Sequence, residues 1–291
     1  MILNSPVPFE EALALRSVQT LLGTELNSAE MSAVLRLLPA ALRQRGFFSA
    51  GVYDFNILNA FYQALKSQLN RQPGDPSLNN FIRQSLAELN YDPGAAAGTI
   101  HDLTSFARLD VMLNTNLDIA QGYGQMVQSV AVQDDWPAWE LYRSESRNVP
   151  RGDPSYKGDA GIAWLDRFQQ SAQAAGDDDA LACVRKFGRM AALISSPLWE
   201  HLGSDFDDSL GNPFPPFAWG SGMDVDSIIY SETVALGLLD PGEKVVRREI
   251  PDLNATLKAP VDTRNQELAD ALVQSLKDFG VKLDNGVLKF K

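Results

Sequence analysis

The segment from residue 211 to residue 223 is too rich in proline for a helix and too aromatic for a solvent-exposed loop. Its three prolines remove backbone donors and hold φ at about −65°. The rings of Phe214, Phe217 and Trp219 favour burial because each carries a large apolar surface. The glycines that follow Trp219 then allow the chain to turn. The sequence therefore predicts that residues 211–223 form a rigid strap across a hydrophobic surface.

The composition limits the class of protein that this chain can be. Its 291 residues are 45% hydrophobic and 21% charged, which is the balance of an ordinary globular protein. The single cysteine, Cys183, excludes an intramolecular disulfide and suits a reducing cytoplasm. No stretch approaches about 18 consecutive apolar residues, and residues 1–10 lack the pattern of a secretory signal. We therefore expect neither export by that route nor contact with a membrane.

The net charge of −12 argues against a nucleic-acid coat protein. Affinity for DNA comes largely from Lys and Arg side chains that neutralise phosphates, and an acidic chain is repelled unless its cations gather on one face. The two dense basic runs, Arg147–Arg151 and Lys244–Arg248, are short. They are interpreted as solvated surface charges, and the sequence predicts no direct nucleic-acid partner.

Residues 1–98 are expected to form a helical region. Apolar residues recur there at spacings of about three to four, the period of amphipathic helices. The predicted helices span Phe9–Leu22, Ser28–Arg45, Asn56–Leu69 and Ser77–Leu89. The connector Gly46–Ala50 holds two adjacent aromatic residues, which predict a plug in the core between helices or, alternatively, a contact between subunits.

Residues 99–242 are expected to form a mixed region, beginning with one long helix, or two end to end, over residues 99–130. Asn114, Thr115 and Asn116 interrupt its apolar stripe with side chains that compete for backbone hydrogen bonds. They are interpreted as a polar helix face or as caps at a helix break. Alternatively, they make a buried polar contact that fixes the segment Tyr142–Arg143.

The rest of that region is rich in loops and large rings, which predict a core of aromatic side chains with loops pinned between short elements. Short helices are predicted at residues 161–174, 179–193 and 231–239. The acidic triplet Asp177–Asp179 is interpreted as a helix start rather than a cation site, because carboxylates stabilise a helix N-terminus and no ligand-spaced partner follows.

Residues 243–291 are expected to form a small α/β tail. Alternation predicts a strand over residues 244–250, and apolar periodicity predicts a helix over Asn265–Phe279. The Asn-Gly pair within residues 283–290 indicates a tight hairpin. Together the three regions predict an α+β fold that is predominantly α, with a helical N-terminal part followed by an aromatic, loop-rich mixed part.

Four motifs in order along the chain resemble the Mu-type minor head proteins, also called the phage head-morphogenesis family. They are Leu113–Gly124, Trp139–Arg151, Ser196–Trp199 and the Pro-Pro-x-x-x-Gly run of the strap, and the resemblance covers residues 100–240. Many members end the last motif with a Gly-Cys-Arg-Cys-like run, where this chain has Gly220-Ser221-Gly222.

The resemblance implies a structural protein of head morphogenesis. Such a protein would contact portal or major capsid subunits in the bacterial cytoplasm and remain in the virion. It assigns structural or interaction roles to Asn114, Thr115, Tyr142, Arg143, Trp199, Phe214, Pro215, Pro216, Phe217 and Trp219.

An enzymatic alternative is a nucleotide-dependent transferase or a hydrolase. In the transferase, Arg143 would bind phosphate and Glu232 a sugar hydroxyl; as structural residues, Arg143 would pair with a carboxylate such as that of Glu145, and Glu232 would cap a helix. The sequence has no P-loop, no dinucleotide-binding glycine loop and no Gly-x-Ser-x-Gly elbow. We therefore predict no catalytic residue, no cofactor and no metal site.

Overall fold

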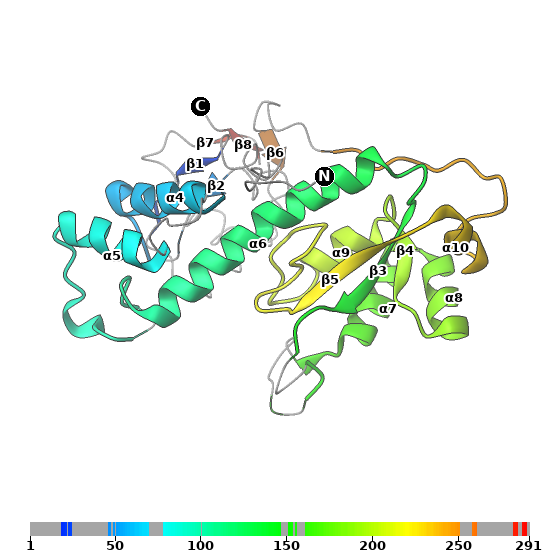
Figure 1. The fold of residues 1–291 in the computed structure, drawn as a ribbon, viewed down its shortest axis with the longest axis horizontal. Coiled ribbons are helices and arrows are strands. Elements are labelled where there is room, and N and C mark those ends of the chain that lie inside the picture. Colours follow the sequence, from blue (N-terminus) through cyan, green and yellow to red (C-terminus); the bar gives the residue numbers. More distant parts are fainter. Residues whose placement is uncertain are drawn as a thin grey trace, which may run out of the picture. The chain divides into compact units, whose positions relative to one another are not determined.

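The computed structural model describes residues 19–21, 23–24, 46–47, 49, 51–69, 78–99, 101–146, 151–153, 155, 161–250, 258–260, 282–284 and 287–289. These residues form α-helices, one short 3-10 helix and small sheets (Figure 1). The fold is α+β and predominantly α, as predicted. No helix among the described residues is long and apolar enough to cross a membrane.

The chain divides into two compact units, and each is described by itself. The first contains residues 1–124 and 253–291, and the second contains residues 125–252. The three regions expected from the sequence divide the chain at other positions. The boundary near residue 124 lies within a helix, and the C-terminal tail belongs to the first unit.

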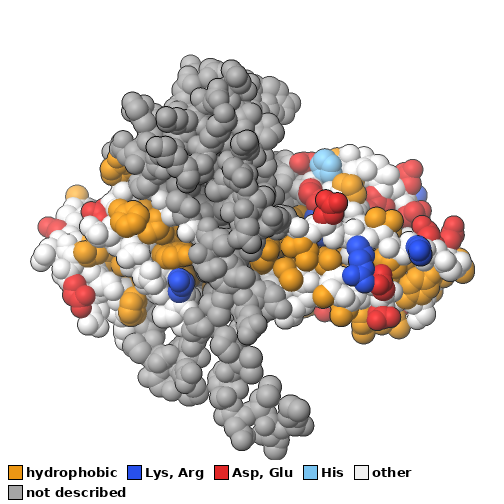
Figure 2. All heavy atoms as spheres, turned by 90° about the horizontal axis from the view of Figure 1, so that it is seen from above, with side chains coloured by type: hydrophobic (Ala, Val, Ile, Leu, Met, Phe, Trp, Pro, Cys, Tyr) orange, Lys and Arg blue, Asp and Glu red, His pale blue; other side chains and the backbone are white. Residues whose placement is uncertain are grey.

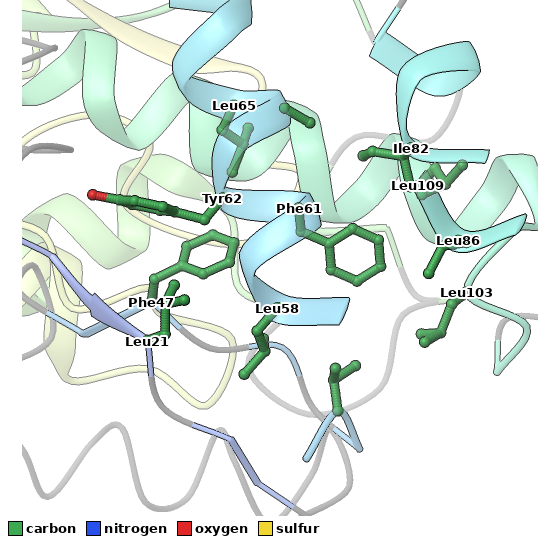
Figure 3. Packing of buried hydrophobic residues seen from close by; sticks show 12 residues of the cluster. Leu21, Phe47, Leu58, Phe61, Tyr62, Leu65, Ile82, Leu86, Leu103 and Leu109 are labelled. Atoms are coloured by element: carbon green, nitrogen blue, oxygen red, sulfur yellow. The ribbon is translucent and has the colours of Figure 1, made fainter. Parts of the chain in front are cut away.

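The core of the first unit lies between α4 (Phe55–Leu69) and α5 (Leu78–Glu88), which confirms two predicted helices. Phe61 and Leu65 of α4, with Ile82 of α5, are fully buried in one cluster (Figure 3). Helix formation is explained by an apolar face that repeats every three to four residues and packs against its neighbour.

Two short strands complete this core. β1 (Thr20–Leu21) pairs in parallel with β2 (Gly46–Phe47). Phe47 is buried and packs against Tyr62, with ring centroids 5.5 Å apart, so this part of the connector plugs the core. The prediction that a helix continues to Leu22 is wrong, because Thr20–Leu21 is a strand. The rest of it, and the predicted helix Ser28–Arg45, lie outside the described residues.

A single long helix, α6 (Phe106–Ala131), follows turns at residues 101–105. The Ser105 hydroxyl accepts the N–H of Arg108 at 3.3 Å and so caps the helix start. Asn114, Thr115 and Asn116 do not break the helix, which excludes caps at a helix break as their role. Asn114 is exposed and Thr115 half-buried, as expected of a polar helix face.

The second unit is built on an antiparallel sheet in the order β4-β3-β5 (Figure 1). Its strands are β3 (Ala138–Arg143), β4 (Ala191–Leu193) and β5 (Met223–Ile228). Ala138 pairs with Leu193 on one side and with Ile228 on the other. The surrounding helices are α7 (Trp164–Ala175), α8 (Asp178–Phe187), α9 (Leu198–Ser204) and α10 (Tyr230–Ala235).

The sequence overestimated the length of two helices here, since α10 ends at Ala235 rather than at Leu239 and α8 stops short of Leu193. α8 ends at Phe187 because Gly188 adopts a left-handed φ of 68° and closes the helix. Residues 191–193, predicted as helix, form the edge strand β4. The start of α8 was predicted correctly: Asp177 is the N-cap, and its carboxylate accepts the N–H of Ala180 at 2.9 Å.

The C-terminal predictions have mixed outcomes. Residues 244–250 are not a strand, which corrects that prediction; side chains rather than another strand hold their backbone. The hairpin is confirmed by β7 (Lys282–Asp284) and β8 (Val287–Lys289), with Asp284 opposite Val287. A third strand, β6 (Lys258–Pro260), pairs with β8. The predicted helix Asn265–Phe279 lies outside the described residues.

Candidate functional site

Trp199 lies at the centre of the aromatic core of the second unit. It follows Leu198 at the start of α9, and its side chain is fully buried. Its ring meets Trp139 edge-on, with centroids 5.6 Å apart, and stacks on Phe217 at 5.8 Å with an interplanar angle of 21°. Its indole N–H donates to the Leu193 carbonyl at 2.8 Å. The ring therefore joins β3, β4 and the strap, and its one polar atom is satisfied.

The strap is a loop closed by its own hydrogen bonds. Ser209 and Ala218 form an antiparallel bridge, and the N–H of Leu210 donates to the Phe217 carbonyl at 2.9 Å. Inside the loop, the Asn212 amide donates to the Pro216 carbonyl at 3.2 Å. The peptide bond between Pro215 and Pro216 is cis. Phe214 and Phe217 are fully buried, which confirms their predicted burial.

A close backbone approach joins the strap to α9. The N–H of Gly211 donates to the Gly203 carbonyl at 2.6 Å. A Cβ atom at Gly203 would lie 1.8 Å from the Asn212 carbonyl oxygen, closer than real Cβ atoms come. Only glycine fits at this position. The sequence analysis did not single out Gly203; a glycine within an otherwise helical run was the available signal.

The expected burial of Trp219 is wrong, since the side chain is 38% exposed. Trp219 lies in the turn that follows the buried Phe217 and Ala218, and its ring is turned outward there. Its backbone is held instead: its N–H donates to the Asp208 carbonyl at 3.0 Å, and its carbonyl accepts from Arg151 Nη2 at 2.7 Å. Trp219 therefore anchors the end of the strap through its main chain.

A pair of arginines shares the carboxylate of Asp208 beside this anchor. Arg167, fully buried on α7, donates to Asp208 Oδ1 at 2.8 Å, and Arg151 pairs with Oδ2. The Arg167 guanidinium also lies 4.6 Å from the centre of the Phe206 ring, within cation–π range. Buried charge of this kind persists only when paired, so Asp208 ties α7 and residue 151 to the strap. No local pattern in the sequence marks this ion pair.

Tyr142 and Arg143 lie at the end of β3. Tyr142 is half-buried opposite Asp224, and its pKa is raised by burial first and then by the charges of Asp224 and Asp226. Arg143 is exposed opposite Met223, and no ion pair joins it to a described residue. The expected carboxylate partner of Arg143 is therefore not found within the described part of the chain.

Arg189, rather than Arg143, is the arginine that carboxylates hold at this sheet. Its Nε donates to Glu140 Oε1 at 2.8 Å, a second nitrogen contacts the other Glu140 oxygen, and its Nη1 contacts Glu232 Oε1 at 2.6 Å. The hydrogen bonds from Glu140 and then Glu232 raise the pKa of Arg189. The planar fork of arginine explains how one side chain joins β3 to α10.

The residues considered for nucleotide transfer are not brought together. Arg143 pairs with Met223 at the start of β5, whereas Glu232 follows the end of β5 and pairs with Arg189. Asn114 and Thr115 belong to the first unit and Tyr142 to the second, so the polar contact expected between them stays a prediction. Over the described ranges, no group of three or more His, Cys, Asp or Glu side chains could hold a metal ion.

The packed centre of the second unit thus unites Trp199, Phe214 and Phe217 around α9 and the strap. Comparisons of this chain with protein-family models, with curated proteins and with solved structures found no match.

Proposed function

We propose that this chain is a minor head protein of the Mu-type head-morphogenesis family. It is a structural protein that contacts portal or major capsid subunits during assembly in the bacterial cytoplasm and then stays in the virion. The observation that supports the proposal is the stacking of Trp199 on Phe217, because these rings come from two of the motifs on which the resemblance rests. Both rings are fully buried, so these motifs supply packing.

The proposal gives this site a structural role. Trp199, Phe214 and Phe217 expose no reactive atom, and the Asp208 carboxylate is held by both Arg151 and Arg167. A closely packed core of this kind suits a protein whose function is to hold other subunits at a fixed geometry.

The proposal includes no direct contact with DNA. In the two basic runs, Arg151 pairs with Asp208, Arg247 with Asp134, and Arg248 with Glu200. Outside the grey atoms in Figure 2, the blue Lys and Arg side chains are scattered, several of them beside red carboxylates. Cations paired in this way release few counterions from DNA, which is the main source of DNA affinity.

Binding to isolated subunits tests the proposal. The tagged chain would be mixed separately with the portal and major capsid subunits encoded with it, and retained protein would be measured. We expect retention of at least one of them at micromolar concentration, and a variant with the strap opened, Phe217→Ala, should retain less. Retention of neither subunit would contradict the proposal.

A further inference from the structure

Four large apolar side chains of the second unit are exposed on segments that hydrogen bonds join. Val132 is 48% exposed, Trp136 41%, Ile229 41% and Val246 68%. The Trp136 N–H donates to the Val132 carbonyl at 3.1 Å, the N–H of Tyr230, next to Ile229, donates to the Asp135 carbonyl at 2.9 Å, and the Gln133 side chain donates to the Val246 carbonyl. We call these four residues the Trp136 patch.

The segment that carries Val246 is held rigidly against the end of α6. The fully buried amide of Gln133 donates to the Val246 carbonyl and accepts the Arg248 N–H, both at 2.9 Å. The Arg248 guanidinium donates to the Ile194 carbonyl at 2.8 Å and pairs with Glu200. An exposed valine on a backbone fixed in this way is preorganised, which lowers the entropy cost of binding.

Carboxylates border the Trp136 patch. Asp134 and Asp135 lie between Val132 and Trp136 in the chain and are exposed; Asp134 is paired with Arg247, and Asp135 carries the border here. On the other side, the Tyr230 hydroxyl donates to the Glu243 carbonyl at 3.1 Å, and the Asp240 N–H donates to the Glu243 carboxylate at 2.9 Å.

The acidic border extends to the start of α8. The pKa of Asp179 is raised by burial and then by the nearby charges of Asp177, Asp178, Asp240 and Glu243. Two separate segments therefore bring carboxylates to one side of the patch. The cations of the Val246 segment are Lys244, Arg247 and Arg248, of which Arg247 is paired with Asp134 and Arg248 with Glu200.

We infer that the Trp136 patch is a docking surface for a basic amphipathic segment of another protein. Apolar side chains of that segment would cover Trp136 and Val246, and its Lys or Arg side chains would face the acidic border. Exposed tryptophan is the residue type that most often dominates binding energy at an interface. The charge of the border favours a basic partner over a second copy of this chain, whose net charge is −12.

A labelled peptide tests this inference without any phage component. The probe is a synthetic amphipathic helix of Leu and Lys, and the control replaces every Lys with Glu. Fluorescence anisotropy would give both affinities for the full chain. We expect the Lys peptide to bind, more weakly as salt rises, and the Glu peptide not to bind.

Variants locate the binding. Trp136→Ser and Val246→Ser should each weaken the affinity of the chain for the Lys peptide by about ten-fold or more. The matched control is Trp219→Ser, because Trp219 has nearly the same exposure, 38%, outside the patch. Unchanged urea melts would show that each variant folds.

Three results would overturn the inference: no binding of the Lys peptide, equal binding of both peptides, or equal loss in Trp136→Ser and Trp219→Ser. If sedimentation of the chain alone reveals a dimer that Trp136→Ser dissociates, a second copy of the chain is the occupant of the patch. This result would also overturn the inference. The peptide experiments do not depend on the proposed head function. The docking surface can therefore be disproved while the head function stands, and the reverse also holds.

Discussion

At the scale of single residues, a missing Cβ atom, backbone hydrogen bonds and one buried ion pair hold the strap in place. Gly203 matters because it has no Cβ atom, and Trp219 matters through its backbone rather than its ring. The Arg167 guanidinium is fully buried, and the Asp208 carboxylate is its ion-pair partner. The sequence indicated the strap but not these anchors: the signal for Gly203 was a glycine within a helical run, and a pairing across 41 residues leaves no local pattern.

Replacing Gly203 with alanine should destabilise the protein although alanine favours helices. The new methyl group would meet the Asn212 carbonyl oxygen, a backbone atom that cannot rotate away. We expect the free energy of unfolding to fall by about 1–3 kcal/mol, the usual cost of overpacking. Urea melts measure it. Gly188→Ala is the control. A Cβ atom there meets nothing within 4 Å, so only the left-handed φ of 68° destabilises that variant. Equal melts of Gly203→Ala and the unmodified chain would show that the strap does not touch α9.

Truncation of strap rings should separate packed from exposed positions. Phe217→Ala removes a fully buried ring that stacks on Trp199, so we expect a loss of about 3–5 kcal/mol. Trp219→Ala removes a ring that is 38% exposed, and we expect a loss of about 1 kcal/mol or less. Thermal or urea unfolding of both variants gives the comparison. A larger loss for Trp219→Ala would mean that its ring is packed after all.

At the scale of elements, the sequence predicted helices better than strands. α4, α5 and α7 have clear apolar periodicity and begin close to the predicted positions. β5 was not predicted, although buried Met223 and Val225 alternate with Asp224 between them. Strand β4 is only three residues long, and pairing with β3 rather than local propensity forms it.

At the acidic start of α8, we expect a substitution at Asp177 to destabilise the protein and one at Asp179 to stabilise it. Asp177→Ala removes the N-cap and should cost about 0.5–2 kcal/mol. The pKa of Asp179 is raised, so its charged form disfavours the folded state at neutral pH. Asp179→Asn should therefore stabilise the protein slightly at pH 7, by less than about 0.5 kcal/mol, because the side chain is exposed. This gain should disappear as the pH falls below the pKa of the unfolded aspartate. Urea melts at pH 7 and pH 3 measure both effects; a gain that grows at low pH would contradict this sign.

At the scale of the whole molecule, composition indicated a globular, acidic protein, and helical periodicity indicated the fold class. Helical periodicity over long segments is strong enough to indicate a mainly α fold. The division into two units could not be read from the sequence, because α6 runs across the boundary without a linker and the tail returns to the first unit. Among the residues singled out from the sequence, Trp199 stacks on Phe217 and Phe214 is buried, whereas Arg143 and Glu232 are not brought together.

The charge of the whole chain predicts its behaviour toward DNA. We expect no binding of labelled duplex DNA at micromolar protein in about 150 mM salt, where charges are screened beyond about 8 Å. The reasons are the net charge of −12 and the pairing of Arg151, Arg247 and Arg248 with carboxylates. Titration by anisotropy tests this expectation. Micromolar binding with a steep salt dependence would restore DNA as a direct partner.

The central claim, a structural role in the phage head, is tested most directly by measuring this chain in purified heads. The tagged chain would be produced together with the portal and major capsid subunits encoded with it, and heads would be separated on a density gradient. We expect the chain to sediment with the heads at a constant ratio to the portal across the peak, and to stay at the top of the gradient when capsid subunits are omitted. A chain that remains at the top in the presence of assembled heads would contradict the account.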